Sequence, residues 1–325
     1  MSRDRLERHQ VWCYLTAVLL GLAVGTIWPQ AGHPVEALVW PVLAVLLYTT
    51  FTQLPLTSIP AAFRDGRFLA AALVGNFLLI PVVVWGLVQF TPDDDALRLG
   101  LLLVLLVPCT DWFITFTQLG RGDATRATAL TPISLLLQLA LLPAYLWLMA
   151  GADFTAVFAP GDVWPALLVL LVPLGLAVLS EVWFARRCGR ERIREGLGWW
   201  PVPLLSVVIF LVATAHVGPA RAALDVLPVV IAVAAVFLAV SLALARLLAT
   251  VGKLSTRQGR TLAFSLGTRN SFIVLPFALS LPAGWEIAAV VVVTQSLVEL
   301  FGMIFYLWFV PRHLFPQRPP DGVSV

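Results

Sequence analysis

The chain has 325 residues, of which 60% are hydrophobic and only 12% charged, and its mean hydropathy is +0.92. A soluble domain does not need so much apolar surface, and the apolar residues come in runs of about 20, so the composition indicates an all-α polytopic membrane protein. The net charge of +3 does not indicate nucleic-acid binding, because the basic residues fall in short loops between the apolar runs.

The apolar runs predict ten membrane-spanning helices, each long enough to cross a hydrocarbon core of about 30 Å. Two halves of five spans, residues 1–151 and 152–325, must have opposite orientations because five is odd. The number of spans therefore predicts two inverted five-helix repeats in one integral membrane unit. The predicted spans are 11–28, 34–54, 68–90, 97–119, 126–150, 164–184, 199–217, 224–249, 259–281 and 285–310.

The basic residues in the loops, in the tails and at the ends of the spans predict the orientation. Seventeen lie on the side of the two tails, and only Arg98 and Arg221 lie on the opposite side. Both termini are therefore predicted to be cytoplasmic in a multi-pass protein of the cell (plasma) membrane. The cytoplasmic group comprises Arg3, Arg5, Arg8, Arg64, Arg67, Arg121, Arg126, Arg186, Arg187, Arg190, Arg192, Arg194, Lys253, Arg257, Arg260, Arg312 and Arg318.

The fourth span is interrupted in its middle, where the apolar run 99–107 is followed by Pro108, Cys109, Thr110 and Asp111. Proline removes a backbone donor, so the helix should break there, and an unwound turn at membrane depth needs protein or water to satisfy its backbone. A carboxylate at mid-membrane is costly and usually marks a pathway, so we assign Cys109, Thr110 and Asp111 to a substrate site. The alternative is a proline-kinked helix with a buried cysteine and a satisfied polar turn.

The ninth span holds the equivalent place in the second half, and residues 264–272 interrupt it with a glycine and several polar side chains. An inverted repeat would bring the breaks of the fourth and ninth spans together, which adds Arg269, Asn270 and Ser271 to the substrate site. An isolated charge at mid-membrane costs about 2.5–3.5 kcal/mol on insertion scales. We therefore predict an ion pair between Asp111 and Arg269.

The tenth span carries Gln295, Glu299 and Gly302 on one face at helical spacing. Gln295 and Glu299 join the candidate substrate site, and Glu299 is the competing partner for Arg269. The alternative is that Glu299 only finds a structural partner. Asn76 in the third span is expected to tie helices together, and the hydroxyls of the fifth span are expected to bond to carbonyls of their own helix.

Cys109 is the only cysteine near a predicted break. A thiolate suits soft partners such as thiophilic metals and metalloids. One thiol cannot form a tetrahedral metal site, and no histidine lies near it in sequence, so neither a metal centre nor a cofactor is predicted. The alternative is that Cys109 is buried and serves only to fill space among its neighbours. The three cysteines are odd in number and widely separated, which argues against a disulfide framework.

One enzyme-like motif is Gly120–Asp123, which fits the GxGD pattern of intramembrane aspartyl proteases. Asp123, however, falls on a predicted cytoplasmic turn, where capping of the fifth span is the plain interpretation. Asp111 lies about three turns away on the preceding helix. No HExxH zinc motif and no P-loop occur in the sequence. The sequence therefore predicts a protein that is not an enzyme and encodes no ATP-driven transport.

Four stretches carry a family resemblance: Asn76–Pro81, Pro108–Thr110, Gly122–Asp123 and the helix that follows as far as Pro143. They resemble the bile acid/sodium symporter superfamily and, within it, the arsenical-resistance (arsenite efflux) permeases. The resemblance implies ten helices in a panel and a core domain, with broken helices four and nine crossing. It also implies a role in transport for Cys109, since the fourth helix of the arsenite permeases carries a cysteine implicated in transport. The resemblance covers most of the chain and is best over residues 41–311.

The chain departs from these relatives in its ninth span. The arsenite permeases typically have Asn-Asn-Phe followed by a functional glutamate, whereas here residues 270–272 read Asn-Ser-Phe and Ile273 follows. The acid that completes the sodium sites of bile acid transporters is missing there too. Asp111 and Arg269 replace residues that are usually neutral. These departures leave the substrate and the coupling ion open.

Three functions fit these observations. The first is export of arsenite or a related metalloid, driven by the membrane potential or a proton gradient. The second is sodium- or proton-coupled transport of a small organic anion, with Arg269 as its counter-charge. The third is a non-transporting receptor or scaffold. The expected partners are a small-molecule or ion substrate and the lipid bilayer, not nucleic acid, and assembly into a homo-oligomer is left open.

Overall fold

A computed structural model of the chain describes residues 3–53, 65–150, 160–184, 193, 196–218 and 223–317. Within these ranges every regular element is helical, as expected of an all-α membrane protein. The elements are α1 (Arg3–Ile27), η1 (Pro29–Ala31), α2 (Gly32–Phe51), α4 (Gly66–Val74), η3 (Gly75–Leu79), α5 (Ile80–Val88), α6 (Asp95–Leu105), α7 (Trp112–Leu119), α8 (Ala124–Ala150), α10 (Pro160–Phe184), α12 (Pro201–Ala215), η4 (Ala223–Asp225), α14 (Leu227–Val251), α15 (Thr256–Gly267), α16 (Ser271–Leu279), α17 (Ile287–Phe309) and η5 (Val310–Leu314).

Seven helical units among the described residues are long and apolar enough to cross a membrane. They lie in α1, α2, the continuous run from α4 to α5, α8, α10, α14 and the run from α17 to η5. Helix α12 is shorter, with 15 residues, and the predicted fourth and ninth spans are each divided into two short helices. The chain is therefore a polytopic helical membrane protein. Ten spans in two inverted repeats stay a prediction.

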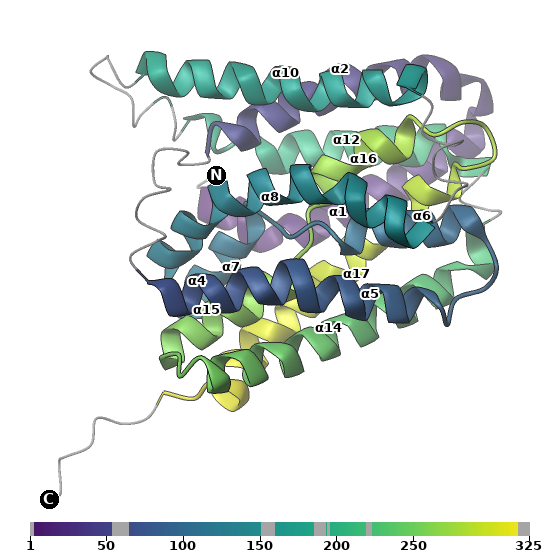
Figure 1. The fold of residues 1–325 in the computed structure, drawn as a ribbon. Coiled ribbons are helices and arrows are strands. Elements are labelled where there is room, and N and C mark those ends of the chain that lie inside the picture. Colours follow the sequence, from purple (N-terminus) through teal and green to yellow (C-terminus); the bar gives the residue numbers. More distant parts are fainter. Residues whose placement is uncertain are drawn as a thin grey trace, which may run out of the picture.

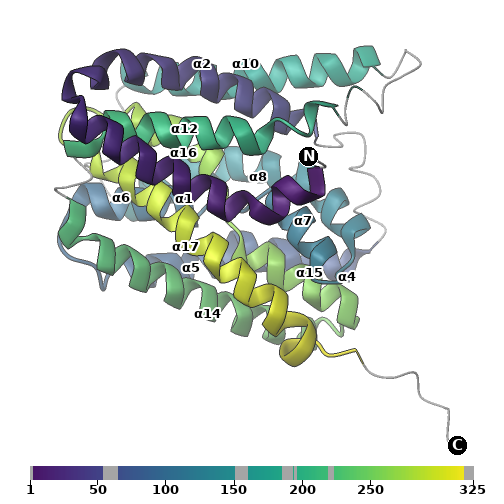
Figure 2. The same ribbon diagram turned by 180° about the vertical axis from the view of Figure 1, so that it is seen from behind.

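The helices form two groups (Figures 1 and 2). In the first group α1 packs on α12, α12 on α2, and α2 on α10. In the second group α14 packs on α15 and α17, α6 on α17, and α7 on α8. Helix α16 lies between the groups, since it contacts α2 and α10 on one side and α17 on the other. The ninth span thus brings its break to the boundary between the two groups.

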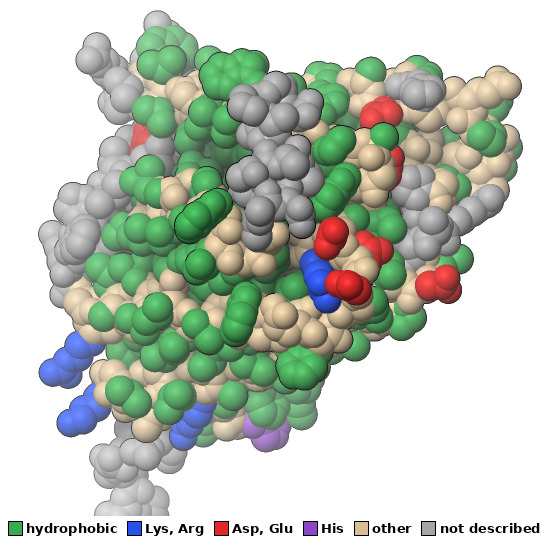
Figure 3. Space-filling model, turned by 45° about the vertical axis from the view of Figure 1, so that its right-hand side comes forward, with side chains coloured by type: hydrophobic (Ala, Val, Ile, Leu, Met, Phe, Trp, Pro, Cys, Tyr) green, Lys and Arg blue, Asp and Glu red, His purple; other side chains and the backbone are tan. Residues whose placement is uncertain are grey.

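One face of the molecule is mostly apolar, with charges toward its two ends (Figure 3). Acidic side chains gather toward one end with a single basic one among them, and further basic side chains lie toward the opposite end. One exposed ion pair joins Asp93 and Arg98, whose guanidinium donates a 2.6 Å hydrogen bond to the carboxylate. This distribution suits a protein whose apolar belt lies in lipid.

The third span contains a wide π-helical turn, η3, just before Pro81. Pro81 has no N–H to donate to the carbonyl of Phe77, four residues earlier. The hydroxyl of Tyr145 on α8 donates to that carbonyl at 2.6 Å instead. The Phe77 carbonyl thus accepts a hydrogen bond that joins the third span to α8, in place of one within its own helix.

A polar cluster joins the beginnings of α4, α8 and α15. Asp123 caps α8 as predicted, because its carboxylate accepts from the main-chain N–H of Arg126 at 3.2 Å. The Arg126 side chain also donates to Asp123 and, at 2.7 Å, to Asp65, which caps α4. Gln258 on α15 donates to Asp65 as well. Burial opposes ionisation of Asp65, but the Phe68 N–H and the Arg126 and Gln258 contacts outweigh it and hold its pKa below the usual value.

Candidate functional site

The two predicted breaks lie side by side, although 160 residues of sequence separate them. Residues 106–111 connect α6 to α7, and residues 268–270 connect α15 to α16. An antiparallel β-bridge joins Pro108 to Arg269. The Cys109 N–H donates to the Thr268 carbonyl at 3.1 Å, and the Asn270 N–H donates to the Val107 carbonyl at 2.8 Å. Each unwound segment thereby satisfies backbone groups of the other at the centre of the protein.

Cys109 is 4% exposed and carries the thiol at this crossing. Its sulfur donates to the carboxylate of Asp111 at 3.1 Å, so a soft nucleophilic atom and a proton acceptor are in direct contact. Asp111 is half-buried and directly precedes α7. No cluster of three or more potential metal ligands occurs among the described residues. The thiol therefore offers one soft ligand rather than a metal cage.

Thr110 and Asn270 lock the two breaks together through their side chains. The Asn270 amide donates to the Thr110 hydroxyl at 2.9 Å, and its oxygen accepts from the Ile273 N–H at 3.3 Å. Asn270 is thus the cap of α16 as well as a link to the other break. Next to it, the hydroxyls of Ser271 and Ser296 lie 2.5 Å apart.

Gln295 and Glu299 approach the crossing from α17. One carboxylate oxygen of Glu299 accepts from the Arg269 N–H at 3.0 Å and from the Gln295 amide at 2.9 Å. The other carboxylate oxygen and the Gln295 side-chain oxygen are buried and have no hydrogen-bond partner among the described residues. Each of these two oxygens can therefore accept a further hydrogen bond, at a place out of contact with bulk solvent.

The predicted ion pair between Asp111 and Arg269 is wrong. The Arg269 guanidinium donates to the Asn76 side chain at 2.9 Å. Among the described residues, it forms an ion pair with neither the Asp111 nor the Glu299 carboxylate. Glu299, the competing partner, contacts the main chain of Arg269 rather than its guanidinium. The guanidinium also lies over the Phe237 ring, 5.2 Å from its centroid.

The charges of Arg269 and Asp111 are each stabilised by a helix end. The Arg269 guanidinium donates to the carbonyls of Ser265 and Leu266 at 3.2 and 2.7 Å, and to that of Leu105 at 3.4 Å. These carbonyls belong to the last turns of α15 and α6, where helix dipoles are negative. Asp111 lies at the beginning of α7, where the dipole is positive. Each broken helix therefore supplies a partner that an unbroken span would lack.

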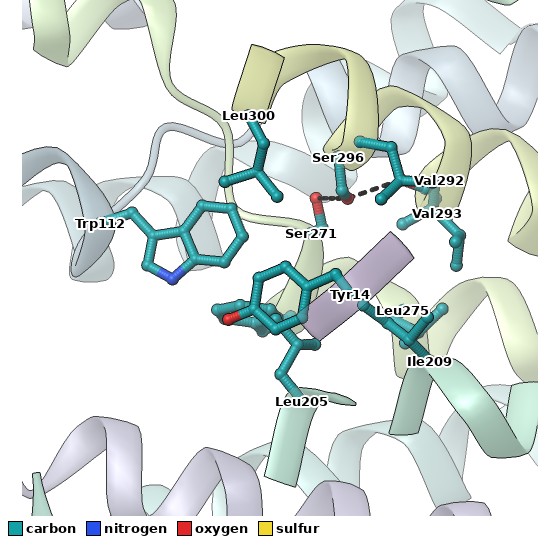
Figure 4. Close-up of a pocket in the computed structure, with 12 residues that line it drawn as sticks. Tyr14, Trp112, Leu205, Ile209, Ser271, Leu275, Val292, Val293, Ser296 and Leu300 are labelled. Carbon is teal, nitrogen blue, oxygen red and sulfur yellow. Dashed lines mark hydrogen bonds between the residues drawn. The ribbon is translucent and has the colours of Figure 1, made fainter. Parts of the chain in front are cut away.

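A narrow cavity lies at the boundary between the two helix groups, beside the crossing (Figure 4). Tyr14 on α1 stacks on Trp112 at the start of α7, with ring centroids 5.9 Å apart. The hydroxyls of Ser271 and Ser296 point toward each other in one wall of the cavity in Figure 4. The twelve lining residues are Tyr14, Trp112, Leu205, Ile209, Ser271, Phe272, Leu275, Val292, Val293, Ser296, Leu297 and Leu300.

Sequence reasoning missed the aromatic part of this site. Trp112 follows Asp111 directly, and its position was a usable signal, but nothing in the sequence pairs it with Tyr14 in the first span. Asn76 ties helices together as expected, because its amide donates to Ser265 at 3.0 Å. Thr131 on α8 bonds to the Ala127 carbonyl of its own helix, also as expected.

Comparison with known proteins places these features in context. The model of the sodium bile acid symporter family matches residues 40–218, more than half of the chain. The chain is similar to the arsenical-resistance protein Acr3 of Corynebacterium glutamicum, with 25% identity over 172 residues. That alignment covers 51% of this chain and 46% of Acr3, so the chain matches about half the length of this relative.

Proposed function

Because the chain belongs to the sodium bile acid symporter family, we propose that it is a secondary transporter that exports arsenite or a related metalloid. The similarity to a protein named for arsenical resistance supports this substrate class. The observation that carries the proposal is the contact between the Cys109 thiol and Asp111 at the crossing of the two broken helices. Transporters commonly bind their substrates where discontinuous helices meet.

The chemistry of this contact suits trivalent arsenic. Arsenous acid exchanges one hydroxyl for a thiol, which forms an As–S bond and releases water, with the thiol proton leaving in that water. Asp111 accepts a hydrogen bond from the thiol and so orients the sulfur before exchange. The remaining arsenic hydroxyls can then bond to polar groups of the crossing. The proposed substrate site comprises Cys109, Thr110, Asp111, Arg269, Asn270, Ser271, Gln295 and Glu299.

Arg269 contributes to this site through its main chain and through the shape of the break. Its guanidinium is occupied by Asn76 and by carbonyls at two helix ends. A substrate anion would have to displace these partners to use Arg269 as a counter-charge. The geometry therefore favours a metalloid over a small organic anion.

The proposed transporter has ten spans in two inverted repeats, residues 1–151 and 152–325, and both termini in the cytoplasm. The pairing of the two breaks supports the repeat, because equivalent spans of the two halves meet there. The beginning of α1 and the end of α17 lie toward the same side of the molecule in both ribbon views, which supports termini on one side (Figures 1 and 2). Export is driven by the membrane potential or by a proton gradient in this proposal.

The test is arsenite flux in everted membrane vesicles, in which an exporter accumulates its substrate. Vesicles containing the protein should take up arsenite when a proton gradient or a membrane potential is imposed, and a sodium gradient alone should have no effect. Vesicles from the same host without the protein are the control. Uptake no greater than in that control, under every gradient, would refute metalloid export.

A further inference from the structure

The cavity beside the crossing combines apolar and aromatic walls with two facing hydroxyls, those of Ser271 and Ser296. We propose that this cavity binds the transported molecule as an uncharged, hydroxyl-bearing species, with Ser271 and Ser296 as its hydrogen-bonding groups. The proposal rests on the transport function above, and it extends the proposed substrate site from Ser271 to Ser296 and the cavity, a contact zone that does not depend on the Cys109 thiol. Arsenous acid, which is neutral at physiological pH, belongs to this class.

The charge of the cavity argues against an anion. None of the described side chains that line it is charged. An anion moved into such a space would lose its hydration without gaining an ionic partner, which is strongly unfavourable. The beginning of α7 could attract an anion through its dipole, but the Asp111 carboxylate already lies at that helix end.

The serine pair allows Ser271 either to donate a hydrogen bond to a hydroxyl of the ligand or to accept one from it. The Ser296 hydroxyl lies within hydrogen-bond distance of both the Val292 carbonyl, at 2.8 Å, and the Ser271 hydroxyl, at 2.5 Å. It has one proton and can donate to only one of them at a time. When Ser296 donates to Ser271, the Ser271 proton is free for a ligand. When Ser296 donates to Val292, Ser271 donates to Ser296 and offers lone pairs to the ligand.

The size of the cavity restricts the ligand further. The cavity volume is about 20 Å³, little more than a single water requires. Its walls come from both helix groups, with Tyr14, Leu205 and Ile209 from the first group and Trp112, Val292 and Leu300 from the second. A ligand of a few non-hydrogen atoms therefore requires the walls to move apart slightly, and a bulky organic anion requires a much larger movement.

Boric acid is the direct probe, because it is neutral and hydroxylated but has no affinity for thiols. It should raise the thermal unfolding temperature of the purified full-length protein and of Cys109→Ser alike, while arsenate, a tetrahedral anion, should not. The double variant Ser271→Ala with Ser296→Ala should lose the boric acid shift. In vesicles the same double variant should raise the KM for arsenite about tenfold, because it loses hydrogen bonds worth about 1.4 kcal/mol.

Ser280→Ala is the matched control, since the Ser280 hydroxyl lies on the same chain segment but bonds to the Phe277 carbonyl outside the cavity. This variant should keep the boric acid shift, and the single variant Ser296→Ala replaces the double variant if the latter does not fold. A boric acid shift that survives loss of the serines, or an equal shift with arsenate, would overturn the cavity proposal. Normal arsenite flux in that case would leave the transport function standing. A serine-dependent shift without any arsenite flux would instead refute metalloid export and leave the cavity.

Discussion

The guanidinium of Arg269 donates a 2.9 Å hydrogen bond to the side-chain oxygen of Asn76, which lies in the π-helical turn of the third span. Both residues are buried, so this charge-assisted bond joins the break of the ninth span to a neighbouring helix out of contact with water. The stability of the crossing therefore depends on Asn76 rather than on Asp111.

Asn76→Ala should lower the free energy of unfolding by about 1.5–3 kcal/mol, the value of a hydrogen bond to a charged group. Combined with Arg269→Gln it should show a coupling of about 0.5–3 kcal/mol, because the two residues share one interaction. Thermal unfolding in detergent measures both quantities. Asp111→Asn with Arg269→Gln is the comparison pair, and its effects should add. Strong coupling in that pair and none between Asn76 and Arg269 would contradict the observed geometry.

The sequence predicted the two breaks but not the partners of their charges. Pro108 and the polar run from Gly267 to Ser271 interrupt otherwise apolar spans, and such interruptions are visible in the sequence alone. The direction of the Arg269 side chain is not visible, because it depends on carbonyls that become available only when α6 and α15 end side by side. Opposite charges suggested an ion pair, whereas helix ends supplied the partners.

The cavity was also beyond the reach of sequence reasoning. Ser271 was assigned to the site because it lies at the break of the ninth span, whereas Ser296 was not assigned to it. Part of the cavity's apolar wall, Tyr14, Leu205 and Ile209, comes from α1 and α12, whose residues resemble any lipid-facing side chains until packing places them. By contrast, the Asp123 cap could be predicted because capping depends on residues close in sequence.

Asp65 should contribute stability that is lost in acid. Its pKa in the folded protein is below its value in the unfolded chain, so the unfolded chain binds the proton more readily. The contribution is complete above the unfolded value, near 3.8, and disappears as the pH falls through the folded value. Asp65→Asn should therefore reduce the loss of unfolding temperature between about pH 6 and pH 3 while keeping the helix cap. A wild-type profile that the substitution leaves unchanged would contradict the Asp65–Arg126 interaction.

Two glycines should respond oppositely to alanine. A Cβ on Gly100 would lie 2.9 Å from the Ala288 Cα and the Val291 Cβ, so α6 and α17 would have to separate. Gly100→Ala should cost about 1–3 kcal/mol of unfolding free energy. Gly86→Ala, where a Cβ meets nothing within 4 Å, should instead stabilise α5 by about 0.4–1 kcal/mol. Melting temperatures of the two variants test this, and equal shifts would contradict the close approach of α6 and α17.

The ten-span topology predicts opposite locations for two sites in the chain. A reporter fused after Gly151 should lie outside the cell, and one fused after Arg194 should lie in the cytoplasm, because one span separates them. The seventeen-to-two distribution of basic residues is the physical reason for this orientation. Paired alkaline phosphatase and fluorescent-protein fusions read the two locations. The same location for both sites would rule out the inverted repeat.

The most direct test of the account is arsenite uptake by everted vesicles that contain either the wild-type protein or Cys109→Ser. Serine keeps the size and polarity of the side chain but loses affinity for soft ligands, so uptake should fall to background while the amount of folded protein is unchanged. Cys13→Ser and Cys188→Ser are the matched controls and should transport normally. Wild-type uptake by Cys109→Ser would show that Cys109 only packs at the crossing and would contradict thiol-dependent export.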